Sequence, residues 1–213
     1  MWRARRSFAV ALLSFVIAVS PAVVARSSTA SGGHVPRGVL TLDRVTVGVS
    51  TIEQAQRIYG KAERSRVSSG EEPDEATCYS AQSGDERLEL IFETGIMGGY
   101  TDITGFRVRT GRPHANCTAI TFDAKRFRTH NGVHLGQTSA NFERVLRIKF
   151  KRRGSELRYE GEGRRVATAA ELKELRGRWP NEAQSYIDVT TTIRARFVAD
   201  RLVDFCVRKI ESY

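Results

Sequence analysis

Hydrophobic and polar residues alternate along six stretches of this chain, and two other stretches carry apolar residues three or four positions apart. The alternating stretches are residues 76–82, 87–93, 104–110, 155–161, 186–198 and 201–210. A period of two is typical of a strand with one buried face, and a spacing of three and four is typical of an amphipathic helix. The pattern therefore predicts a chain rich in antiparallel strands with few helices.

The two helix patterns begin at similar motifs. The first lies in "VTVGVSTIEQAQRIYG" (45–60) and the second in "GVHLGQTSANFERVL" (132–146). Ser50, with Glu53 three residues later, predicts a capping box, and Thr138 predicts the cap of the second helix. Both motifs lack the second glycine and the Gly-Lys pair of a phosphate-binding loop, so we interpret them as helix starts.

The flanks of the two motifs are also alike, which indicates an internal repeat. A strand-like run precedes each helix, at 38–45 and 117–122, and alternating segments follow each. We predict an α+β fold of two β-α-β-β-β repeats, each an antiparallel sheet packed on a helix, at 38–112 and 113–213. A further helical pattern at 168–179 interrupts the second repeat.

Parity along the strands predicts which side chains face the core. The inward set is Leu88, Leu90, Phe92, Phe106, Val108, Ile120, Phe122, Ile193, Ala195, Phe197, Val203, Phe205 and Val207. The opposite, open face receives Arg107, Arg109, Arg194, Arg196, Arg208 and Asp204, together with all three cysteines. An arginine-rich open face predicts a surface that contacts a partner.

The N-terminal segment predicts export. Arginines at positions 3, 5 and 6 precede a run of apolar residues, and small residues end the segment at Ala25. We predict a signal peptide at 1–25, a flexible Ser/Gly-rich leader at 26–37, and no transmembrane segment after cleavage. The expected location is periplasmic or secreted, and the export route stays open.

Three cysteines in an exported chain predict one disulfide and one remaining thiol. Cys78–Cys117 is the preferred pair because the two residues flank the first repeat. Cys117–Cys206 is the alternative, since it would join the two repeats.

Charge is concentrated in the second half of the chain. The formal net charge is +10, and residues 113–213 hold 20 basic and 12 acidic side chains, or +8. The run "RVLRIKFKRR" (144–153) includes Arg144, Arg147, Lys151, Arg152 and Arg153. We predict that these residues form a basic edge that attracts an acidic protein or an anionic envelope component. Nucleic acid is less favoured for an exported chain.

On the two helix-start motifs and the hairpins that follow them, the chain resembles the small exported proteins that share the fold of the β-lactamase inhibitory protein and related outer-membrane assembly lipoproteins. That resemblance implies a protein-binding role. The arginine-rich face and the 168–179 segment depart from the group's pattern, and no inhibitory residue carries over.

Catalytic patterns are weak. His130 and His134 have the spacing of two helical zinc ligands, but Asn131-Gly132 between them predicts a turn. We therefore expect a non-enzymatic module with no metal, cofactor or small-molecule substrate. The expected function is protein binding, with inhibition of an acidic secreted or periplasmic protein as one form, and an envelope-assembly or anionic-lipid-associated role is the alternative.

Overall fold

The computed structural model describes residues 35–66, 75–83, 86–95, 101–111, 116–121, 127–178 and 185–212, and all structural statements below concern these residues. They form three α-helices and a mostly antiparallel sheet. The long strands are β4 (Glu75–Ser83), β5 (Glu86–Thr94), β6 (Ile103–Thr110), β9 (Glu156–Val166), β10 (Tyr186–Val198) and β11 (Arg201–Ser212). These match the six alternating stretches of the sequence.

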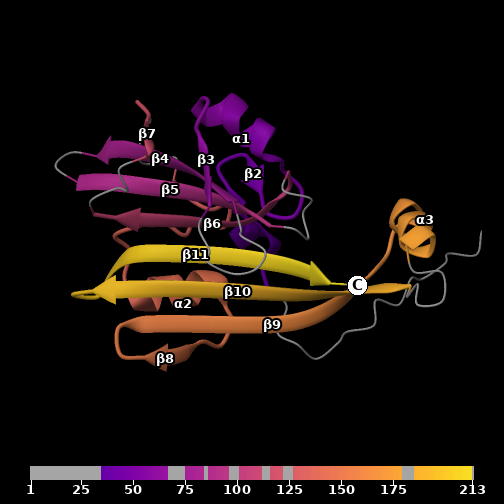
Figure 1. Cartoon of the computed structure of the whole chain (residues 1–213). Helices are drawn as coiled ribbons and strands as arrows, with labels where there is room; N and C mark the ends of the chain where they lie inside the picture. The colour runs from indigo at the N-terminus through magenta and orange to yellow at the C-terminus, as the bar shows by residue number, and fades with distance from the viewer. Residues whose placement is uncertain are drawn as a thin grey trace, which may run out of the picture.

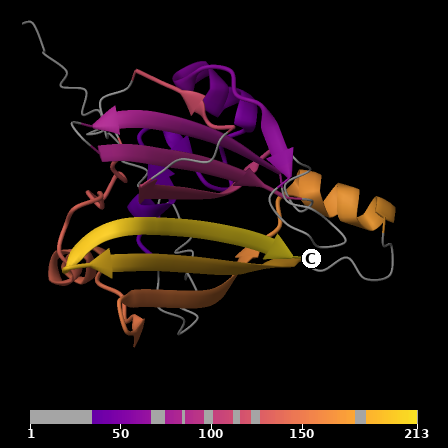
Figure 2. The same cartoon turned by 60° about the vertical axis from the view of Figure 1, so that its left-hand side comes forward.

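The long strands belong to one sheet, where the sequence predicted two. The order is β3-β4-β5-β6-β11-β10-β9-β8, with short strands β3 (Arg64–Arg66) and β8 (Lys151–Arg153) at the ends. The first and second halves of the chain meet where β6 pairs antiparallel with β11. Figures 1 and 2 show β11 running beside β6 across the middle of the sheet.

The predicted strand at 117–122 is shorter than expected and lies beside the first half. Strand β7 (Thr118–Ala119) pairs parallel with β4 at Tyr79 and Ser80. Strand β3 pairs with β4 at Glu75–Thr77, so the two short strands share one edge of β4. Strand β7 therefore belongs to the first half of the sheet, although the sequence predicted it as the first strand of the second repeat.

The segment at 38–45 forms a 3-10 turn (Arg37–Leu40) and a small hairpin of β1 (Thr41–Leu42) and β2 (Val45–Thr46), where the sequence predicted one strand. Helix α1 (Ile52–Tyr59) follows. Its N-cap is Thr51, which exchanges hydrogen bonds with Gln54 in a capping box. The prediction of Ser50 as the cap was wrong, because its hydroxyl instead accepts a hydrogen bond from Thr46 N, 2.9 Å away.

Thr138 caps helix α2 (Ser139–Leu146), as predicted, and its hydroxyl accepts a hydrogen bond from Asn141 N. A second residue also secures this helix start. Asp200, in the turn between β10 and β11, accepts hydrogen bonds from the backbone N and the hydroxyl of Ser139 at 3.1 and 2.6 Å. A carboxylate at a helix N-terminus is stabilised by the free N–H groups there.

The two helix starts make matching backbone hydrogen bonds. Gly48 N donates to Ile103 O at 2.7 Å, and Ile103 N donates to Ser50 O at 2.9 Å. In the second half, Gly136 N donates to Leu202 O at 2.8 Å and Leu202 N donates to Gln137 O at 2.9 Å. Both glycines have a positive φ, which side chains with a Cβ rarely adopt. Each helix is therefore anchored to the start of the last strand in its half.

One hydrophobic core lies between the sheet and the layer containing α1 and α2. The described members of the predicted inward set are buried, except that Ile120 is half-buried and Val203 lies outside the core. Leu202 takes the place of Val203 because the β10–β11 register shifts at Arg196/Phe197. Phe122 lies outside the described residues.

Aromatic rings join the two halves of the core. Tyr59 of α1 packs near Tyr79 and Phe92, with ring centroids 5.5 and 5.6 Å apart. Phe142 of α2 contacts three other rings, and Phe106 meets Phe205 edge-on across the β6–β11 junction at 5.8 Å. The core is thus continuous from one helix to the other.

The predicted helical insertion is present as α3 (Ala169–Arg178), which lies beyond one end of the sheet in Figure 1. Arg165 of β9 connects it to the sheet by hydrogen bonds to Glu171 of α3 and Glu211 of β11. Hydrogen bonds from Arg165 lower the pKa of Glu171 to about 2. Burial alone would raise the pKa of Glu211, but the hydrogen bonds from Arg165 and Lys209 outweigh burial and lower it.

The predicted signal peptide and most of the leader lie outside the described residues. Within the described ranges, no helix has the length and apolar character needed to cross a membrane.

Substituting Phe142→Ala should lower the free energy of unfolding by about 3–5 kcal/mol, because a fully buried ring that joins α2 to β10, β11 and Phe150 is lost. The measurement is urea unfolding followed by circular dichroism. Val145→Ala, at a half-buried position of the same helix, is the matched control and should cost clearly less. Equal losses would mean that Phe142 is not a central contact.

Acid should loosen α3 before the rest of the fold. The pKa of Glu171 is depressed in the folded protein, so its contribution is complete above its unfolded value near 4.5 and is lost as pH falls towards about 2. Hydrogen exchange, corrected for intrinsic rates, should show faster exchange at 169–178 than at 139–146 over this window. Glu171→Gln should reproduce the effect at neutral pH. Unchanged exchange at 169–178 in that variant would contradict the proposed attachment.

Candidate functional site

The candidate site is the open face of the sheet, which we define as the face opposite α1 and α2. In Figure 1, α2 lies behind β10, and none of the described helices lies over the face towards the viewer. Side chains at paired positions of adjacent strands point to the same face, so the strand register arranges this surface in rows. Three neighbouring rows hold all five arginines predicted for this face.

We call the middle one the central row. From edge to edge it consists of Lys151, Arg158, Arg194, Cys206, Arg107, Ile91 and Cys78. It holds four cations and no acid. The first three are direct neighbours on strands about 4.8 Å apart, and like charges that face each other across a strand pair destabilise the sheet. This arrangement therefore costs stability unless acids of the neighbouring rows or a partner offset the repulsion.

The rows on either side contain the acids. One row is Arg153, Glu156, Arg196, Asp204, Arg109, Glu89 and Ser80, in which the charges alternate in sign. The other is Glu160, Thr192, Arg208, Gly105, Glu93 and Ala76. Cations of the central row can thus be neutralised only from a neighbouring row or by a partner.

Three of the five arginines predicted for this face are held by carboxylates of the same face. Arg107 donates two hydrogen bonds to Asp204, a side chain only 9% exposed. Those bonds raise the pKa of the Arg107 guanidinium. Arg208 donates to Glu93 from Nε at 3.0 Å and from Nη2 at 2.7 Å.

Arg109 forms an ion pair with Glu89, whose side chain is 1% exposed. Buried carboxylates of this kind require a paired cation, so these arginines serve the stability of the sheet. The sequence prediction did not include Glu89 and Glu93, although their alternation with Leu88, Leu90 and Phe92 places them on the open face.

Arg194 and Arg196 differ from the other three. Both side chains are exposed. Arg196 reaches Asp204 only at 4.0 Å, and Arg194 has no ion pair with a carboxylate of the described residues. The sequence pattern alone could not separate these two arginines from the paired ones, because the difference depends on which acids the register places beside them.

The predicted basic edge divides between two faces. Lys151 and Arg153 pair in register with Arg158 and Glu156, so they extend the open face to the edge of the sheet. Arg152 points to the opposite side, where it forms an ion pair with Glu143 of α2 at 3.0 Å.

Arg144 and Arg147 lie on and just after α2. Arg144 donates to Asn141, and Arg147 is the left-handed C-cap of the helix. A cation at this end suits the helix dipole. Exposed cations on β8 also discourage pairing of the open sheet edge with another chain. The basic run therefore supplies Lys151 and Arg153 to the candidate site, while its other predicted members serve the helix.

The cysteines follow the preferred prediction. Cys78 and Cys117 are bonded, with a Cα–Cα distance of 4.6 Å, while Cys206 is buried and free. The alternative pair is wrong. Cys117 is bonded to Cys78 of β4, which lies three strand spacings, or about 14 Å, from Cys206, and a disulfide spans far less. Burial is the main cause that raises the pKa of the Cys206 thiol.

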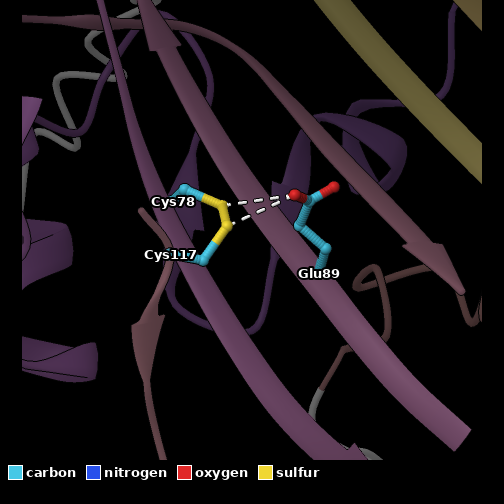
Figure 3. A group of neighbouring side chains, drawn as sticks. All are labelled: Cys78, Glu89 and Cys117. Atoms are coloured by element: carbon cyan, nitrogen blue, oxygen red, sulfur yellow. Dashed lines mark hydrogen bonds between the residues drawn. A yellow bond between two sulfur atoms is a disulfide. The ribbon is translucent and has the colours of Figure 1, made fainter. Parts of the chain in front are cut away.

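A buried carboxylate lies against the disulfide (Figure 3). Glu89 Oε1 is 3.5 Å from Cys78 Sγ and 3.3 Å from Cys117 Sγ, while Oε2 faces Arg109. The three ligand atoms could hold a metal ion only after reduction, because the thiolate is the ligand form of cysteine. In the bonded state the group links β4 and β5 to Cys117, the residue before β7.

The two histidines lie in a turn, as the Asn131-Gly132 pair indicated. Arg128 and His134 form an isolated bridge, and His134 Nδ1 lies 2.9 Å from Gly132 O. His130 is exposed, and its backbone N donates to Thr41 O. The helical zinc-ligand arrangement that their spacing allows is therefore not formed.

Comparisons with protein-family models, curated proteins and solved structures found no match to this chain. The resemblance to the fold group of the β-lactamase inhibitory protein stays a prediction that rests on the two helix-start motifs.

Replacing both Cys78 and Cys117 by serine should lower the free energy of unfolding by about 4 kcal/mol, the loop-closure estimate for a separation of 39 residues. Urea unfolding measures the loss. Cys206→Ala is the control and should change stability much less. A thiol assay of the unfolded wild-type protein should find one free thiol, and three free thiols would refute the pairing.

Proposed function

We propose that this chain is an exported, non-enzymatic module that binds an acidic protein through the open face of its sheet. The observation that carries the proposal is the central row, where Lys151, Arg158 and Arg194 are direct neighbours and the row itself holds no acid. Of these three, Arg158 has an ion pair with Glu160 of the neighbouring row. Cationic surfaces attract and orient acidic partners before contact. Inhibition of a secreted or periplasmic protein is one form that such binding takes.

Apolar side chains beside the charged rows support the same role. Val166, Tyr186 and Ile210 are 67, 55 and 42% exposed, and by strand parity all three belong to the open face. Val166 and Tyr186 line a groove of about 750 Å³ together with charged residues of β9 and β10. Tyrosine and apolar residues surrounded by charge are typical of protein interfaces.

We also propose that the face arose by duplication of one module. Support comes from the order helix, short strand and three long strands, which occurs in both halves, and from the matching hydrogen bonds at Gly48 and Gly136. Antiparallel pairing of the last strand of each module then gives a single surface with contributions from both. The predicted signal peptide and the disulfide support an exported location.

A second candidate is an envelope-associated role with anionic lipid as the ligand. It is favoured by the exposed cations of β8, of which Lys151 and Arg153 face the same side as the central row. A lipid surface requires only a density of positive charge near an interface. It gives no role to the groove beside Tyr186, which is why we rank it second.

Salt-dependent capture distinguishes these candidates. We expect the purified protein to form a stoichiometric complex with an acidic protein of the envelope or secreted fraction, with an association that weakens as salt rises. Hydrogen exchange on the isolated complex should show new protection on β9, β10, β11 and β6. Protection limited to α1 and α2, or binding only to vesicles that contain anionic lipid, would reject the proposal.

A further inference from the structure

Arg194 lies in the interior of the open face, on β10, and neither of its neighbours in the central row is an acid. Arg158 faces it directly on β9, and the next charged side chain of the central row on its other side is Arg107. Arg158 has Glu160 at 3.0 Å, and Arg107 has Asp204. Arg194 is left beside two cations with no ion pair to a described carboxylate, although guanidinium groups pair readily with carboxylates.

A small pocket opens beside this side chain. It has a volume of about 110 Å³ and is lined by Arg107, Glu156, Arg194, Ala195, Arg196, Asp204 and Cys206. Since a water molecule occupies about 30 Å³ in the liquid, the pocket has room for a carboxylate and a methylene group. Three guanidinium groups surround it, and only Arg107 has a close acid partner.

We propose that this pocket binds one carboxylate side chain of the acidic partner, held by Arg194 and Arg196. The two arginines lie two residues apart on the same face of β10, so their guanidinium groups can approach one carboxylate from both sides. Arg107 keeps its ion pair with Asp204 and makes the electrostatic potential in the pocket more positive. This inference rests on the proposed function and specifies which part of the face recognises the partner.

A protein acid fits the surroundings better than a free anion. Lys151 is two strands from Arg194, so a second cationic position lies about 10 Å from the pocket. Two acidic residues separated by two others lie on the same side of a polyproline II segment, about 9 Å apart. The asymmetry of the pocket, with Asp204 and Glu156 on one side, disfavours a multiply charged ion such as phosphate.

The test uses the capped peptide acetyl-Glu-Gly-Gly-Glu-amide as the probe. Binding is followed by NMR through the side-chain Nε–H signals of arginine. We expect the Arg194 and Arg196 signals to shift and saturate, with little effect from the glutamine analogue of the peptide or from inorganic phosphate. Arg194→Gln should weaken peptide binding at least about tenfold.

Arg57→Gln is the matched control. Arg57 is exposed on α1, on the opposite side of the sheet, so the variant loses the same charge away from the open face. Its peptide affinity should stay near that of the wild type. Urea unfolding should show that Arg194→Gln is at least as stable as the wild type, since the variant removes a repulsive neighbour of Arg158.

The outcomes separate this inference from the proposed function. Equal weakening by Arg57→Gln and Arg194→Gln, or equal binding of phosphate, would overturn the pocket. A protein complex that Arg194→Gln leaves intact would overturn the pocket and keep the protein-binding role. Peptide binding at Arg194 with no protein complex from any fraction would support the pocket and reject the wider function.

Discussion

The antiparallel pairing of β6 with β11 is the interaction on which the rest of this structure depends. It joins strands from the two halves of the chain into one sheet, with Phe106 and Phe205 in contact on the core side and Arg107 bonded to Asp204 on the other. Without it each half would have an unpaired strand edge and half a core. Both the continuous core and the rows of the open face are consequences of this one register.

Much of the fold could be predicted because local signals and tertiary demands agree. The six alternating segments became strands, since every second residue meets the core. Prediction failed where contacts beyond the local pattern decide which of two adjacent residues takes a structural role. Thr51 rather than Ser50 caps α1 because Ser50 is already bonded to Thr46, and Leu202 rather than Val203 is buried because of a register shift. The hydrophobic periodicity of the strands also could not show that the two predicted sheets form one continuous sheet.

The candidate site was predicted as a face but not as a pattern. Parity placed the arginines on one side of the sheet, and it could have placed Glu89 and Glu93 there too. Parity says nothing about which strands become neighbours. Only the register shows that Arg107, Arg109 and Arg208 meet acids while Arg194 meets Arg158. The distinction between structural and available arginines is therefore a tertiary property.

The free thiol of Cys206 has a consequence for how the chain acquires its correct covalent structure. Three cysteines allow three pairings, yet the finished sheet leaves one sulfur under guanidinium groups and distant from the other two. Once β6 and β11 have paired, the Cys206 thiol is too distant to attack the Cys78–Cys117 disulfide. Assembly of the sheet thus selects the native disulfide, because a molecule with either of the other two cysteine pairings cannot form this sheet.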